Sequence, residues 1–173
     1  MLSDSELLAN LAYHEQIYNN ASGDLRVMLL SSKASILEVC GWLEQAMDMI
    51  VSDAAKRCAL SAARIKLIDK DYIRKTNGFS YQGHFEKMLV SVIGYRMLEA
   101  AENHAGTAIP AMDGALTYLT PMRNYYAHTH FNIASPFPRD MTSIPGPTAT
   151  KGYAQTAIVG LAALELALIA LKC

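Results

Sequence analysis

Residues 36–50 read ILEVCGWLEQAMDMI, and this stretch decides the fold class. Its apolar side chains recur at alternating intervals of four and three residues, which is the period of one face of an α-helix. The stripe consists of Ile36, Cys40, Leu43, Met47 and Ile50. It therefore predicts a long amphipathic helix whose apolar face packs on other helices.

The pattern around this helix extends in both directions. Helical spacing continues past the stripe toward Arg74, with a bend expected near Ser52–Asp53, and the turn-forming run 76–78 ends it. Before it, Ser3 and Glu6 have the spacing of a capping box, which predicts a first helix from there to about Asn20. The sequence ASGD at 21–24 separates the two helices.

Two further helices are predicted in the second half. One runs from about Gln82 to Asn103 and is closed by Gly106. The next starts at Pro110, and Pro121 within it is expected to kink the helix or to restart it with Thr120 as N-cap.

Residues 133–150 hold four prolines and predict a long irregular loop, since proline removes a backbone donor and fixes φ. A last helix is expected from about Gly152 to Leu171. The sequence therefore predicts one all-α domain over 1–173, an up-down bundle of four to six helices with a Pro-rich loop before the last one.

Composition excludes several classes of protein. The chain has 173 residues, 51% of them hydrophobic and 18% charged, which is too apolar for a disordered protein. Three cysteines are too few for a disulfide scaffold. The formal net charge of −1 excludes binding of nucleic acid by overall basicity, so a role on RNA would need a local basic site.

We expect a cytoplasmic location, because the N-terminal sequence does not resemble a secretory signal. The N-terminal residues MLSDSELLANL lack the basic region of a secretory signal, and the spacing of Cys40, Cys58 and Cys173 is typical of reduced thiols. The apolar stretch 154–171 is rich in alanine and interrupted by Gln155, Thr156 and Glu165, so we interpret it as a buried helix with a membrane anchor as the alternative.

Polar chemistry concentrates in the stretch RNYYAHTH at residues 123–130. Arg123 is permanently cationic and can grip a phosphate through a planar fork of donors. His128 can give or take a proton near neutral pH. Proton transfer and stabilisation of a charged phosphorane are the two functions that cleave RNA without a metal.

Helical geometry qualifies this assignment. At about 100° per residue, Asn124 and His128 share a face, whereas Arg123 and His128 diverge by about 140°. Either the long arginine side chain reaches round the helix, or the two groups meet across a two-fold axis between two copies of the chain.

This stretch resembles the signature of the HEPN superfamily of small α-helical ribonucleases, in which an arginine and a polar residue precede a histidine. The variant Arg-Asn-x-x-Ala-His is matched by Arg123, Asn124, Ala127 and His128. The resemblance also covers Leu116 and Leu119 before the motif and, more loosely, Leu43–Glu44 and the apolar last helix.

The resemblance implies a metal-independent endoribonuclease without a cofactor, acting as a homodimer with a composite site and leaving a 2′,3′-cyclic phosphate. Many members act as toxins or in phage defence, which implies an antitoxin or regulatory protein as a partner. Toxin branches that are modified by a nucleotidyltransferase carry tyrosine where this chain has His130. Other members only bind RNA or protein, so a non-catalytic binding module is the alternative.

Four further residues are candidates for supporting roles. Glu44 and Arg96 both fall on apolar stripes, so they either pair with each other or leave Glu44 to orient Arg123 or His128. His130 and Tyr125 lie within or beside the motif. The sequence contains no Glu-x-x-His pattern, which is the pattern that binds metal ions in helical bundles.

Overall fold

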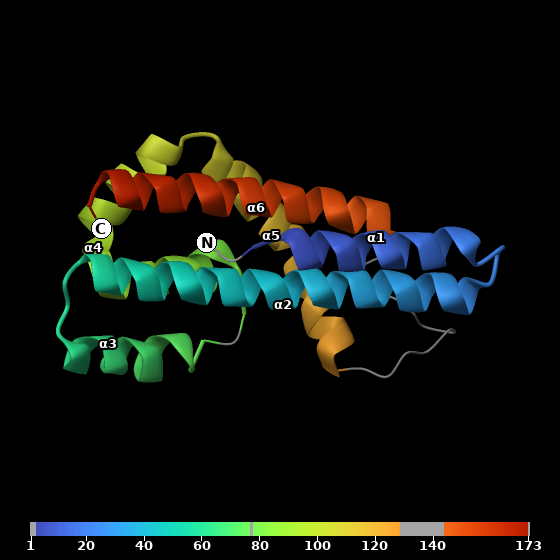
Figure 1. Ribbon diagram of the computed structural model, residues 1–173, viewed down its shortest axis with the longest axis horizontal. Coiled ribbons are helices and arrows are strands. Elements are labelled where there is room, and N and C mark those ends of the chain that lie inside the picture. The colour runs from blue at the N-terminus through green and yellow to red at the C-terminus, as the bar shows by residue number, and fades with distance from the viewer. Residues whose placement is uncertain (1–2, 77, 129–143, 173) are drawn as a thin grey trace.

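Helices account for most of the chain in the computed structural model, which describes residues 3–76, 78–128 and 144–172. Within these ranges there are six α-helices, two π-helical turns and no strand, which confirms the predicted all-α class. In chain order the elements are α1 (Ser5–Asn20), α2 (Leu25–Arg57), α3 (Ala62–Ile68), η1 (Asp69–Ile73), η2 (Tyr81–Phe85), α4 (Glu86–Ala105), α5 (Ala108–His128) and α6 (Pro147–Ala170) (Figure 1).

The first two helices form an antiparallel hairpin whose turn is fixed by Asp24. Its Oδ1 accepts hydrogen bonds from the backbone N–H groups of Arg26 at 2.9 Å and Val27 at 3.2 Å, which caps α2. At the other end of α1 the capping-box prediction is wrong. Asp4 is the N-cap without a side-chain bond, and Ser3 lies one residue outside the helix.

The long helix α2 ends earlier than its pattern predicts. It passes through Ser52–Asp53 without interruption and stops at Arg57, not near Arg74. Ala59 then adopts a left-handed φ of 52°, which turns the chain so that α3 and η1 form a separate helical segment. Apolar periodicity persisted across this turn, so it could not reveal the break.

Helix α4 is divided by a glycine. Gly94 has φ 73° and ψ 161°, a combination that a residue with a Cβ rarely adopts, and it interrupts the helical path between Glu86 and Ala105. Gly106 closes the helix with φ 61°, as predicted.

Helix α5 continues through Pro121, so the predicted restart with Thr120 as N-cap is not found. The Thr120 hydroxyl instead donates to the carbonyl of Leu116 at 2.7 Å, inside the helix. Buried side chains on both sides of the proline hold the helix together, namely Leu116, Leu119, Met122 and Tyr126. Packing of this stripe outweighs the lost backbone bond.

The last helix begins five residues before its predicted start, with Pro147 in its first turn, where a missing N–H is harmless. It packs on α1, α2, α4 and α5. Gly160 allows the closest approach to α5, since a Cβ there would lie 2.4 Å from Cβ of Met112. Residues 129–143, which hold most of the predicted Pro-rich loop, lie outside the described ranges.

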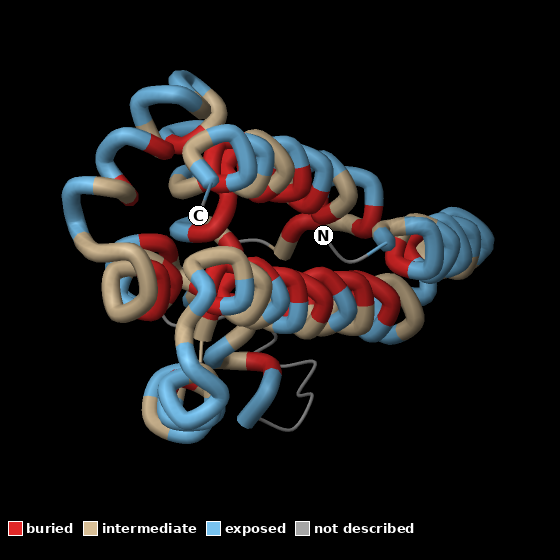
Figure 2. The backbone as a smooth tube through the Cα atoms, turned by 60° about the vertical axis from the view of Figure 1, so that its left-hand side comes forward, coloured by how far each residue is buried: buried red, intermediate tan, exposed pale blue. Residues whose placement is uncertain are grey.

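The core lies between α2, α5 and α6, and their inward faces are buried along much of their length (Figure 2). Helix α6 is long and apolar enough to cross a bilayer, but half of its most apolar window is buried inside the bundle. The core helix of a soluble protein has the same properties.

Candidate functional site

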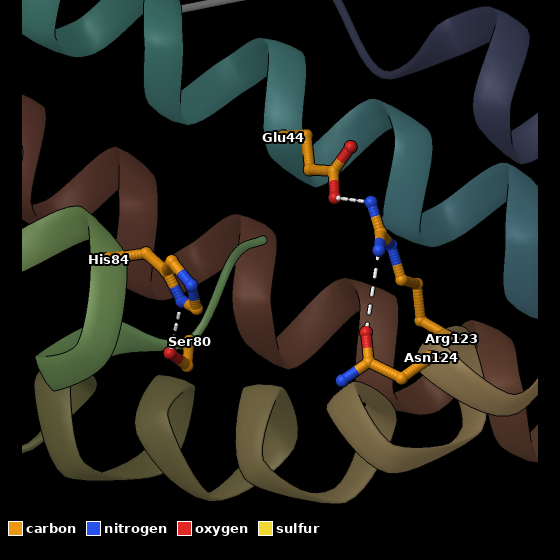
Figure 3. A network of polar contacts seen from close by, with 5 residues as sticks. All are labelled: Glu44, Ser80, His84, Arg123 and Asn124. Carbon is orange, nitrogen blue, oxygen red and sulfur yellow. Dashed lines mark hydrogen bonds and ion pairs between the residues drawn. The ribbon is translucent and has the colours of Figure 1, made fainter. Parts of the chain in front are cut away.

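The predicted motif meets the long helix α2 through one ion pair. Nη2 of Arg123 on α5 donates to Oε1 of Glu44 on α2 at 2.6 Å, and Figure 3 shows the guanidinium reaching from one helix to the other. The exposed fraction of the side chain is 20% for Arg123 and 32% for Glu44. The pair is therefore largely sheltered from water, where its attraction is stronger than on an open surface.

The local sequence of each helix explains why Arg123 and Glu44 are in contact. Glu44 follows Cys40 by one helical turn on α2, at the edge of the stripe that faces the core. Arg123 follows the buried Met122 on α5, so its stem leaves the core beside α2. Of the two alternatives for Glu44, the structure has it paired with Arg123.

Arg96 lies away from this pair. It was expected on the apolar stripe of its helix, but it is exposed on α4. The left-handed residue Gly94 lies two positions earlier and changes the helical phase, so the face inferred from regular spacing does not hold beyond it.

Asn124 belongs to the same contact on its solvent side. Its Oδ1 accepts from Nη1 of Arg123 at 3.4 Å, a long hydrogen bond, and its side chain is exposed (Figure 3). Glu44 and Asn124 thus hold the two terminal nitrogens of the guanidinium from opposite sides. This arrangement fixes the direction in which the remaining donors of Arg123 point.

The two tyrosines of the motif pack on each other. Tyr125 is half-buried and lies edge-to-face on the buried Tyr126, with ring centroids 5.1 Å apart. Nζ of Lys33 lies 5.8 Å from the centre of the Tyr126 ring. Burial, and secondarily Tyr125, raises the pKa of Tyr126 to about 12, so this phenol stays protonated at neutral pH.

His128 is the last residue of α5 and is exposed. Among the described residues its side chain has no hydrogen-bond partner. It is five residues from Arg123, so the two side chains leave the helix in different directions. His130 lies outside the described ranges.

Sequence reasoning missed one acidic residue of the site. Asp48 lies one turn beyond Glu44 on the same side of α2 and is partly buried. Desolvation raises the pKa of Asp48 to about 6, helped by the negative charges of Glu44 and of Asp69 on η1. The spacing of four between Glu44 and Asp48 was the signal that could have identified it.

Cys40 lies one turn before Glu44 and is buried. Its burial raises the pKa of the thiol, the carboxylate of Glu44 adds to this, and Arg123 opposes it. The thiol is therefore protonated at neutral pH and is a packing residue, not a nucleophile.

A second polar pair is seen in the same view. The Ser80 hydroxyl and Nδ1 of His84 are 2.6 Å apart at the start of η2 (Figure 3). A Cβ at Gly78 would lie 2.8 Å from Cε1 of His84, and one at Gly83 would lie 2.5 Å from Oγ of Ser80. The two glycines thus allow tight packing around this pair, which indicates that the pair stabilises the start of η2.

No group of three His, Cys, Asp or Glu side chains in the described part of the chain could hold a metal ion. What the Arg123 cluster can do is bind an anion at the guanidinium edge that Glu44 and Asn124 leave free. Comparisons with protein-family models, with curated proteins and with solved structures find no match to this chain.

Proposed function

We propose that the protein is a metal-independent endoribonuclease of the HEPN type. The observation that supports this most is the position of Arg123, held by Glu44 and Asn124 at the end of a helix whose last residue is the exposed His128. An oriented cation and an accessible imidazole are the two groups that cleavage of a phosphodiester without a metal requires.

In this reaction the 2′-oxygen of a ribose attacks the adjacent phosphorus and the 5′-oxygen of the next nucleotide leaves. Neutral His128 takes the proton of the 2′-hydroxyl and then gives a proton to the leaving oxygen. Arg123 stabilises the additional negative charge on the phosphorane. The products are a 2′,3′-cyclic phosphate and a free 5′-hydroxyl.

Glu44 acts through Arg123 as a positioning residue. By holding Nη2, it limits the rotamers of a long side chain. Asn124 does the same from the solvent side. Tyr125 supports the segment by packing on Tyr126.

The divergence of Arg123 and His128 along one helix supports a composite site. In a homodimer, His128 of one copy would work with Arg123 of the other across a two-fold axis. We also propose that the protein acts in the cytoplasm as a toxin or phage-defence effector whose partner is an antitoxin or regulatory protein.

A second candidate is a non-catalytic helical module that binds RNA or protein. One observation favours it: the strongest contact of Arg123 is an interhelical ion pair that would also serve stability alone. In that case, neither Arg123 nor His128 would affect any reaction.

Purified protein incubated with mixed RNA in excess EDTA separates the two candidates. The nuclease produces fragments that end in a cyclic phosphate, and His128→Ala abolishes them. Intact RNA with the wild-type protein, or equal cleavage by wild type and His128→Ala, overturns the proposal.

A further inference from the structure

Charge is distributed unevenly along a chain whose net charge is close to zero. Residues 1–55 hold eight acidic side chains and two basic ones. Residues 56–75 hold seven lysines and arginines against two aspartates, a formal net charge of +5 within twenty residues. Residues 56–75 therefore form a local basic site, of the kind that a role on RNA needs in a chain whose net charge is near zero.

These twenty residues form a distinct structural unit, the basic arm, made of the end of α2, α3 and η1. Its inner side is apolar: Ile68 is buried, and Ile65 and Ile73 pack against the core as half-buried side chains. The π-helical turn Asp69–Ile73 explains the spacing, since a turn of five residues places Ile73 above Ile68. The apolar side of the arm is thus turned to the protein.

The outer side of the arm carries cations in water. Arg64, Lys66 and Lys70 are exposed, and within the described ranges none of them has an ion-pair partner. Arg74 and Lys75 pair with Asp69 and Asp71 on the same turn. Such exposed pairs contribute little and can exchange for a phosphate.

An aromatic ring lies among these charges. Tyr72 is 43% exposed and lies two positions from both Lys70 and Arg74 in the sequence. Aromatic side chains on a basic surface are the usual platforms on which unpaired bases stack. Two nucleic-acid contacts, to phosphate and to a base, are therefore available on one short segment.

The basic arm and the end of α5 lie on the same side of the molecule. Both project below α2 in Figure 1 and again in Figure 2. Asp48 on α2 lies close enough to Asp69 of the arm and to Glu44 for both charges to raise its pKa, so the arm lies near the turn of α2 that holds Arg123. A strand bound along the arm would run toward the motif.

We propose that the basic arm is the docking surface for single-stranded RNA. Arg64, Lys66 and Lys70 bind phosphates, Tyr72 stacks on a base, and the bound strand extends from the arm to the motif at 123–128. The delivery step rests on the proposed nuclease function, whereas the binding step does not.

RNA fits the arm better than a membrane surface does. A helix that lies in a bilayer interface inserts a broad apolar face, but the isoleucines of this arm pack inward. On its outer side only Leu67 and Tyr72 are large exposed apolar residues. The arm therefore offers charge and one stacking ring without an inserting face.

The binding test uses a fluorescent single-stranded 2′-O-methyl oligonucleotide, which lacks the attacking hydroxyl and cannot be cleaved. Anisotropy is measured for the arm variant Arg64→Gln/Lys66→Gln/Lys70→Gln. Its matched control is Arg26→Gln/Lys87→Gln/Lys172→Gln, which removes the same three charges from exposed positions elsewhere. Circular dichroism melts verify that both variants are folded.

We expect the arm variant to bind at least about tenfold more weakly and to lower the slope of log K against log salt by about 2, since each phosphate contact contributes about 0.7. The control variant should bind like wild type. Tyr72→Ala should weaken binding by about tenfold with an unchanged slope, because stacking is not ionic. Equal affinities of arm and control variants overturn the proposal.

Cleavage of unmodified RNA separates this inference from the proposed function. A higher KM with unchanged kcat in the arm variant supports both. Binding of RNA through the arm without cleavage supports the docking proposal and contradicts the proposed nuclease function. The docking proposal is overturned if the arm variant cleaves RNA like wild type. It is also overturned if the arm binds only vesicles of anionic phosphatidylserine, or only the acidic residues 1–55 of a second copy of the chain.

Discussion

Arg123 and Glu44, separated by 79 positions in the sequence, are joined by a 2.6 Å ion pair between α5 and α2. The pair ties the motif to the helix that organises the core. It also leaves Glu44 next to Asp48, so that removing the arginine would leave two carboxylates facing each other on one helix.

Because Asp48 lies beside Glu44, replacing Arg123 and replacing Glu44 should change the free energy of unfolding by different amounts. Arg123→Gln should destabilise the protein by about 1–2 kcal/mol, whereas Glu44→Gln should change stability by less than about 0.5 kcal/mol because it relieves Asp48. Urea denaturation of both variants and of the double variant measures the coupling, which we expect to be about 1 kcal/mol. Additive effects would show that the pair is energetically irrelevant.

His128 should matter for activity and not for folding. Its side chain is exposed and has no partner in the described part of the chain, so His128→Ala should change the free energy of unfolding by less than about 0.5 kcal/mol. Loss of a proton-transfer group should reduce RNA cleavage at least about 100-fold. A large loss of stability with retained cleavage would contradict both parts.

Asp48 gives the fold a pH dependence of defined sign. Its pKa is about 6 in the folded protein and about 3.9 in an unfolded chain, so it stabilises the fold fully below about pH 4, and this contribution disappears as the pH rises through 6. Between about pH 4.5 and about pH 7.5, wild type should lose about 1 kcal/mol relative to Asp48→Asn, after allowance for solvent screening. Parallel urea titrations of the two proteins at both pH values measure this difference, and a constant gap would rule out the assignment.

Gly160 should tolerate no larger side chain. A Cβ there would lie 2.4 Å from Cβ of Met112 and 2.9 Å from the carbonyl oxygen of Ala108, so Gly160→Ala should destabilise the protein by about 2 kcal/mol through overpacking. Gly152→Ala on the same helix meets no atom within 4 Å and should stabilise it by up to about 1 kcal/mol. Thermal melts of the two variants should shift in opposite directions.

Helix periodicity predicted the elements where apolar spacing alone determines structure. The stripe from Ile36 to Ile50 and the buried face of α5 follow their patterns because burial rewards that spacing in any helical context. Spacing could not predict the turn at Ala59 or the break at Gly94, since each depends on a backbone conformation that leaves the apolar rhythm almost intact.

The candidate site was predictable in its residues but not in its contacts. Chemistry and spacing predict Arg123, Asn124 and His128 as candidates, and they leave two alternative partners for Glu44. Only three-dimensional packing could decide that it pairs with Arg123, because ion pairs between helices depend on their crossing. The net charge does not reveal the basic arm, because it averages over the whole chain.

The packing of α6 on four other helices has a consequence for biosynthesis. Since α1, α2, α4 and α5 all contact α6, their apolar faces have no complete partner until the last helix has left the ribosome. The bundle can therefore complete its packing only after α6, residues Pro147–Ala170, has been synthesised and released.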